Sequence, residues 1–181
     1  MGSILGRNER KKTMQEVDYC VMILRTDIES TKKIFEDIKP SFEVARGAYA
    51  TEMSLITKMP ESYYKINITD EEPQTFCLAI DKKNNVLGFI LLEADGRTMT
   101  LWTCHVYVRP EVRCQGIYKL MMKRVHKFAK DAGFRRVFSV VNQRNKPSQI
   151  AHKSVGFKRN WIGYEIKEED IANDNYEKIV G

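Results

Sequence analysis

Three strand-like segments joined by short turn sequences constrain the fold of this chain more than any other feature. They are rich in β-branched, aromatic and other apolar residues, a composition typical of strands, and they cover residues 76–80, 86–93 and 99–108. Asp81-Lys-Lys-Asn-Asn85 and Asp95-Gly96 supply the turn residues between them. The pattern therefore predicts three consecutive antiparallel strands.

Apolar residues change to helical spacing after Pro110, which predicts a helix that begins at about Gly116. Gly133 suits its C-terminal end, where a left-handed backbone favours glycine. Earlier in the chain, Pro40 is expected to end a helix because proline lacks an amide hydrogen. The other predicted elements are a strand at 19–25, helices at about 27–39 and 42–58, a loop at 60–74, a strand at 137–141, a helix at 147–155 and a strand at 157–167.

These elements follow the order β-α-α-β-β-β-α-β-α-β, which predicts an α/β fold with a mixed, mostly antiparallel central sheet flanked by helices. The 181 residues suit one domain, placed at 19–167. Residues 1–18 are expected to form a flexible lead-in, and residues 168–181 an acidic C-terminal tail.

Composition narrows the classes of function. No apolar run approaches the length that spans a bilayer, so no membrane partner is expected. The start of the chain lacks the apolar core of a secretory signal. The four cysteines are scattered, without a zinc or disulfide pattern, which favours a reduced, cytoplasmic protein without a metal. Motifs of P-loop NTPases, Rossmann dehydrogenases and zincins do not occur in the sequence.

The net charge of +6 favours anionic partners, which include phosphate-bearing cofactors and nucleic acid. A basic nucleic-acid-binding domain is therefore one alternative, although basic and acidic residues are mixed along the chain and nucleic acid is the less favoured partner. The segment Val106–Leu120 points to a phosphate-bearing cofactor, since it predicts a strand, a turn and a helix start. Unpaired amides at a helix start bind anions, and Gly116 allows close approach while Arg113 adds positive charge.

This segment resembles the acyl-CoA-binding signature R/Q-x-x-G-x-G/A of the GNAT superfamily of N-acyltransferases. Arg113 takes the first position and Gly116 the central glycine, whereas Tyr118 stands where the pattern has Gly or Ala. A second stretch, Asn145–Phe157, resembles the pattern N-x-x-A-x-x-x-Y-x-x-x-G-F, with His152 at the tyrosine position. The order of predicted elements also fits the fold of that superfamily.

The resemblance implies acetyl-CoA as co-substrate and no metal. Backbone amides of the signature would hold the diphosphate, and the strand before it would pair with the pantetheine arm. Asn145 would contact the cofactor or fix the following helix, with Ser148 beside it. The cofactor-binding residues implied are Val106, Tyr107, Val108, Arg113, Cys114, Gln115, Gly116, Ile117, Tyr118, Asn145 and Ser148.

The implied reaction is transfer of an acetyl group to a primary amine by direct attack in a ternary complex. His152 would donate a proton to the leaving thiolate, the role of tyrosine in most of the superfamily. His105 and Glu93 are alternative general bases, since Trp102 stands near the position where many members have glutamate. The acceptor is not identified by any motif. A catalytically silent CoA-binding module is the second alternative, and a homodimer, common in the superfamily, is left open.

Overall fold

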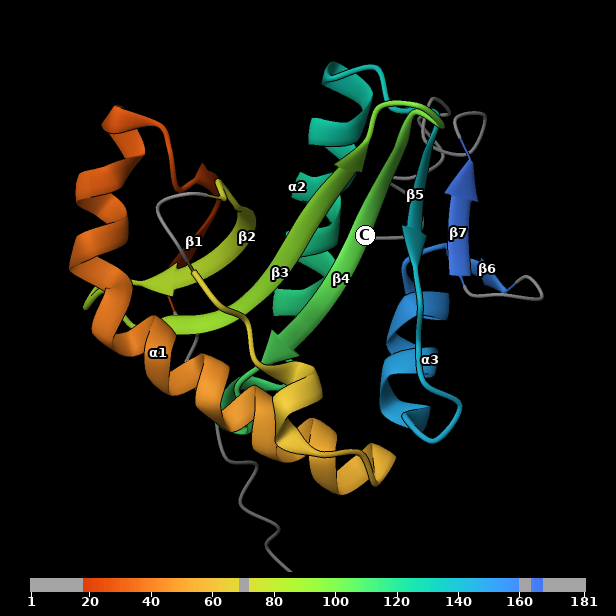
Figure 1. Cartoon of the computed structure of the whole chain (residues 1–181), viewed down its shortest axis with the longest axis horizontal. Coiled ribbons are helices and arrows are strands. Elements are labelled where there is room, and N and C mark those ends of the chain that lie inside the picture. The colour runs from red at the N-terminus through yellow and green to blue at the C-terminus, as the bar shows by residue number, and fades with distance from the viewer. Residues whose placement is uncertain (1–17, 69–71, 160–163, 168–181) are drawn as a thin grey trace, which may run out of the picture.

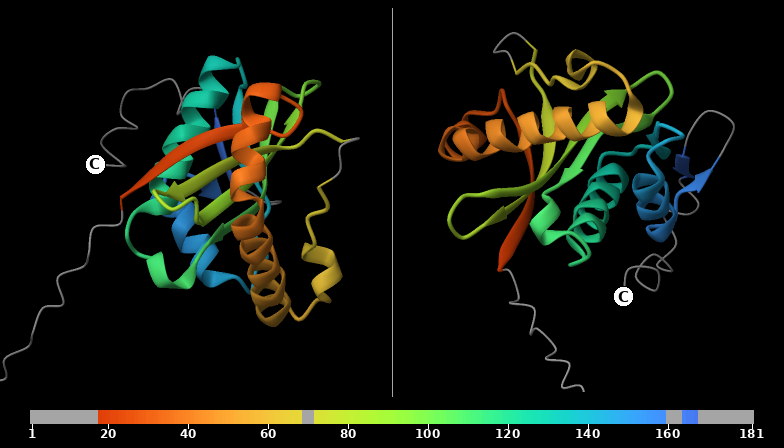
Figure 2. Two further views of the ribbon diagram at one scale, coloured as in Figure 1. Left: turned by 90° about the vertical axis from the view of Figure 1, so that its left-hand side faces the viewer. Right: turned by 90° about the horizontal axis from the view of Figure 1, so that it is seen from below.

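The described residues form a seven-stranded sheet with helices on both faces (Figures 1 and 2). The computed structural model describes residues 18–68, 72–159 and 164–167, so the predicted lead-in and acidic tail lie outside the described residues, apart from Asp18. The strand order is β1-β2-β3-β4-β5-β7-β6. The strands are β1 Tyr19–Arg25, β2 Thr75–Asp81, β3 Val86–Asp95, β4 Thr100–Val108, β5 Arg136–Ser139, β6 Lys158–Arg159 and β7 Tyr164–Lys167.

The helices cover the two faces of the sheet unequally. They are α1 Glu29–Thr57, α2 Ile117–Asp131 and α3 Lys146–Ser154, with short 3₁₀ helices η1 Glu61–Tyr64 and η2 Pro110–Val112. Helix α1 lies on one face and α2 and α3 lie on the other (Figure 2). Two clusters of buried side chains match this division, one that includes α1 residues such as Phe42 and one that includes α2 residues such as Met121. The predicted α/β fold class is confirmed.

Helix α1 is continuous through Pro40, so the predicted break at this residue is wrong. Buried residues at helical spacing lie on both sides of the proline, and Phe42 packs against Phe76 and Phe89 with ring centroids 5.0 and 5.4 Å apart. Proline in a helix interior costs about 3 kcal/mol, and each buried large apolar side chain contributes about 2 kcal/mol. Burial on both sides therefore offsets the proline, which leaves a bend in α1 (Figure 1).

The final strand predicted at 157–167 is two strands instead. Strands β6 and β7 pair antiparallel with each other, and residues 160–163 between them lie outside the described residues. The segment 60–74, expected as a loop, contains η1. The alternation of apolar and polar residues, together with the turn residues, located the other strands to within a few residues. These signals do not reveal that the chain reverses direction between β6 and β7.

Strands β4 and β5 form the parallel pair of the described sheet, and they separate soon after they meet. They pair over Thr100–Trp102 of β4 and Arg136–Phe138 of β5, whereas β4 continues to Val108 (Figure 1). A register shift opposite Leu91 and Leu92 leaves Cys104 as an extra residue in β4, and such a bulge bends a strand. The separation leaves one edge of β4 open toward the space between α2 and α3.

No helix within the described ranges is long and apolar enough to cross a membrane.

Candidate active site

The turn between β4 and α2 has the backbone geometry expected of an anion site. Gly116 is the N-cap of α2 with φ +82°, a left-handed conformation that glycine adopts without strain. Cys114, two residues earlier, is also left-handed with φ +60°. Gly116 has no side chain that could cap the first turn of α2. The amide hydrogens of that turn are therefore directed outward, where the helix dipole favours an anion.

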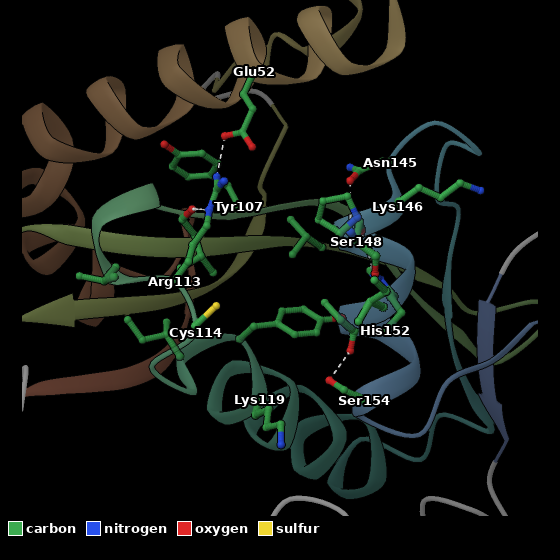
Figure 3. A pocket seen from close by; sticks show the side chains of 18 of the residues that line it. Glu52, Tyr107, Arg113, Cys114, Lys119, Asn145, Lys146, Ser148, His152 and Ser154 are labelled. Carbon is green, nitrogen blue, oxygen red and sulfur yellow. Dashed lines mark hydrogen bonds and ion pairs between the residues drawn. The ribbon is translucent and has the colours of Figure 1, made fainter. Parts of the chain in front are cut away.

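A pocket of about 630 Å³ lies beside this turn, between β4, α2, α3 and the second half of α1 (Figure 3). Its wall includes ten of the eleven predicted cofactor-binding residues. Gln115 is not in the wall, and its side-chain amide instead donates to the carbonyl of Glu111. Two sequence motifs separated by a helix and a strand thus meet at one cavity.

Arg113 is held by the protein's own groups at the mouth of the pocket. Its Nε donates to the carbonyl oxygen of Val108 at 2.9 Å, and its Nη2 donates to Glu52 Oε2 at 2.6 Å. Figure 3 shows Glu52 extending from α1 toward this guanidinium. Hydrogen bonding to Glu52 raises the pKa of Arg113, so the positive charge is permanent.

Asn145 begins α3 and joins it to α1. Its Oδ1 accepts a hydrogen bond from the amide of Ser148 at 3.1 Å, a typical N-cap. Its Nδ2 contacts Met53 Sδ at 3.4 Å, and the neighbouring Arg144 donates to the carbonyl of Thr57 at 2.7 Å. The start of α3 is therefore tied to the end of α1 across one side of the pocket.

His152 lies in the pocket wall but is 1% exposed, with both ring nitrogens bonded inside the protein. Nδ1 lies 2.8 Å from the carbonyl oxygen of Ser148, and Nε2 lies 2.9 Å from Ser139 Oγ. Because a carbonyl only accepts, we assign the proton to Nδ1, which leaves Nε2 to accept from Ser139. Burial lowers the pKa of His152 to about 4. The ring is therefore neutral at physiological pH, and the geometry favours a role in positioning α3 against β5.

Tyr118 departs from the cofactor-binding pattern and extends toward α3. Its ring centroid is 5.6 Å from that of His152, the other departure from the two patterns. The aromatic side chain of Tyr118 therefore lines the pocket and reaches from α2 to α3. The two unusual residues lie in contact, although they belong to separate motifs.

The two candidate bases, His105 of β4 and Glu93 of β3, lie on the α1-facing side of the sheet and outside the pocket wall. His105 Nδ1 is 2.8 Å from the hydroxyl of Tyr49, which is itself in the wall. Burial lowers the pKa of His105, and the negative charge of Glu93 opposes that effect. Glu93 also lies near Cys104, whose pKa burial raises to about 12, so that thiol is protonated. The structure brings His105 and Glu93 together but separates them from His152.

The contribution of α1 to this site carries no sequence motif. Glu52 and Met53 line the pocket beside the predicted residues, yet no motif marks them. Tyr49 was detectable only as an aromatic residue in a predicted helix. The described part of the chain contains no group of three or more His, Cys, Asp or Glu side chains that could hold a metal ion.

The family model described as "Acetyltransferase (GNAT) family" matches residues 31–157, more than half of the chain. The chain therefore belongs to the GNAT acetyltransferase family, as its motifs predicted. In a sequence search, no curated protein matches it.

Solved structures of several acetyltransferases resemble this fold at low sequence identity. Tetrahymena GCN5 is 13% identical, with a TM-score of 0.56 over 83% of this chain and 97% of that one. A putative GNAT acetyltransferase from Desulfovibrio desulfuricans is 14% identical, with a TM-score of 0.55 over 82% and 99%. The match to nourseothricin acetyltransferase, at 22% identity and a TM-score of 0.45, covers 51% of this chain and about half of that protein, 55%. At these identities the likeness is one of fold.

Proposed function

We propose that the protein transfers an acetyl group from acetyl-CoA to a primary amine by direct attack in a ternary complex. The observation that carries the proposal is the left-handed glycine start of α2, which opens into a pocket at the separation of β4 and β5. The proposal also includes a cytoplasmic location, supported by four free cysteines in the described chain.

The residues present fit a CoA molecule. The amides after Gly116 suit the diphosphate, because a left-handed glycine and the helix dipole are both in place there. The edge of β4 beyond its pairing with β5, at Val106 and Val108, suits an extended arm with amide groups, which would pair as an added strand. When bound there, the cofactor supplies a thioester carbonyl, and an amide hydrogen of β4 would polarise it.

The two histidines beside the pocket have different roles in this proposal. His105 accepts the proton of the attacking amine, because it is on the face covered by α1 and its pKa is lowered by burial. Glu93 is exposed and stabilises the imidazolium that forms. His152 is neutral and internally bonded, so we assign it to positioning Ser139 and α3 and not to protonating the thiolate.

A catalytically silent CoA-binding module is a second candidate, and one observation favours it. His152 stands where most of the superfamily have the tyrosine that protonates the thiolate, but both of its ring nitrogens are hydrogen-bonded inside the protein. A pocket without a proton donor at this position would bind CoA and release no thiol.

Two measurements test these functions. Thermal unfolding with saturating acetyl-CoA should raise the midpoint, because a ligand that binds the folded state stabilises it. Thiol release should then be measured with glucosamine, phenethylamine, Nα-acetyl-lysine and a peptide with a free N-terminus. Binding with amine-dependent release supports the enzyme, and binding without release supports the silent module. A failure of acetyl-CoA to stabilise the protein would contradict both and favour a nucleic-acid-binding domain.

A further inference from the structure

Tyr49 lies between the pocket and the side of the sheet that carries His105. The side chain is 4% exposed and contributes to the pocket wall from α1. Its ring packs edge-to-face on His105, Phe89 and Tyr107, with centroids 5.4, 5.6 and 6.1 Å away. Such packing holds the phenol in one orientation, so its hydroxyl is pre-organised with respect to β4.

The hydroxyl of Tyr49 lies 2.8 Å from Nδ1 of His105, a normal hydrogen-bond distance. Burial raises the pKa of Tyr49 well above its usual value, so the phenol keeps its proton at physiological pH. A protonated phenol that donates to Nδ1 requires a lone pair on that nitrogen and a proton on Nε2. His105 is then a neutral base that is ready to receive a proton at the atom facing Tyr49.

The groups around His105 come from three elements. Tyr49 faces it from α1, Glu93 from β3, and Cys104 adjoins it in the bulge of β4. Cys104 and Tyr49 are both uncharged at physiological pH because burial raises their pKa values. Glu93 is therefore the charged neighbour of His105, and its carboxylate favours the imidazolium that a proton transfer would create.

We propose that Tyr49 is a catalytic residue that passes the proton of the acceptor amine to His105. The proposal rests on the acetyltransferase function and adds a residue that contacts the reacting nitrogen. His105 does not line the pocket, whereas Tyr49 does and is bonded to it. Tyr49 therefore lies between the pocket and the imidazole of His105.

The transfer balances without a further reactant. The amine nitrogen attacks the thioester carbonyl carbon, a C–N bond forms, and the nitrogen becomes positively charged. Its N–H proton moves to Tyr49 Oη while the phenolic proton moves to His105 Nδ1, so the phenol is unchanged. The C–S bond then breaks, the thiolate leaves with the electron pair, and an amide is formed. His105 returns its proton to solvent.

Tyr49→Phe separates this relay from a structural role, since it keeps the ring and removes only the hydroxyl. We expect kcat to fall about 100-fold, the usual scale of proton-transfer catalysis, with unchanged affinity for acetyl-CoA. The decrease of kcat/KM at low pH, which reports protonation of His105, should also disappear. Tyr63→Phe is the matched control, because Tyr63 is 66% exposed in η1 and lies outside the pocket wall.

An unchanged kcat and pH profile in an active protein would overturn the relay and leave the acetyltransferase function intact. A wild-type protein that turns over no amine would overturn both proposals. Nitrogen-15 NMR of the imidazoles provides a readout without turnover, with His105→Gln to assign the signal. We expect an unprotonated Nδ1 at His105, and a protonated Nδ1 at neutral pH would overturn the relay.

Discussion

The guanidinium of Arg113 and the carboxylate of Glu52 form an ion pair inside the pocket, with 2.6 Å between Nη2 and Oε2. The two residues are 61 positions apart and come from the turn between β4 and α2 and from α1. The carboxylate neutralises the cation that the signature places there, and it adds negative charge where CoA phosphates would lie. The pair therefore competes with the proposed co-substrate.

Glu52→Gln should increase the affinity for acetyl-CoA, because it removes that competing charge. Both side chains are partly exposed, and exposed ion pairs contribute less than about 1 kcal/mol, so we expect about a threefold decrease in Kd. Isothermal titration calorimetry measures it. Glu43→Gln is the control, since Glu43 pairs with Arg46 on the same helix and outside the pocket wall. Weaker binding by Glu52→Gln, but not by the control, would show that Glu52 assists the cofactor instead.

Gly116→Val should weaken acetyl-CoA binding by at least about tenfold. A Cβ at this position meets no atom within 4 Å, but φ is +82°. A β-branched residue is strained there by about 1–2 kcal/mol, so the turn and the amides after it must shift. Gly47→Val provides a control, since Gly47 is exposed in α1 and a Cβ there also meets nothing. Equal affinity of both variants would place the phosphates elsewhere.

His152→Phe should lower the free energy of unfolding by about 2 kcal/mol, the scale of losing two buried hydrogen bonds. The partners are Ser139 Oγ and the carbonyl of Ser148. Urea unfolding of the variant, of Ser139→Ala and of the double variant forms a cycle. The double variant should lose less stability than the two single losses added together. Strict additivity would contradict the contact.

Acid should destabilise the protein before its carboxylates titrate. Burial lowers the pKa of His126 to about 3 and that of His152 to about 4, from 6.5. Between these values and 6.5 the unfolded chain binds protons that the folded chain does not, so stability is complete above about pH 6.5 and falls as the pH decreases. At about pH 5 each histidine costs on the order of 2 kcal/mol. Urea unfolding from pH 7.5 to 5 measures this loss.

The aspartates with lowered pKa values, Asp27, Asp81 and Asp95, contribute only below this range, since their usual value is 3.8. His152→Phe should reduce the pH dependence between 6.5 and 5, which assigns part of it to that residue. Equal stability at pH 7.5 and 5 would contradict the burial of neutral histidines.

Local patterns predicted the fold well because sheet alternation and turn chemistry act over a few residues. The β2–β4 meander and α2 are within a few residues of their predicted bounds. The continuity of α1 was not predictable in this way, because it depends on Phe42 packing against strands more than 30 residues away. The cofactor side of the site was also local: Gly116 and Asn145 each belong to a short motif.

The proposed acceptor side was not predictable from local patterns, since it consists of contacts between segments that are distant in the sequence. Tyr49 and His105 are 56 positions apart, and nothing near either residue in the sequence indicates the other. His152 illustrates the same limit, because its place in a motif indicates a catalytic group while its burial against Ser139 lowers its pKa to about 4.

The sequence by itself determined the family, the sheet order of the central strands and the glycine turn between β4 and α2, because each depends on residue spacing within one segment. Only the tertiary structure decided the charge state of His152, the pairing of Arg113 with Glu52 and the contact of Tyr49 with His105. Burial and distance set ionisation and hydrogen bonding, and both are defined only when α1, β4 and α3 have packed together.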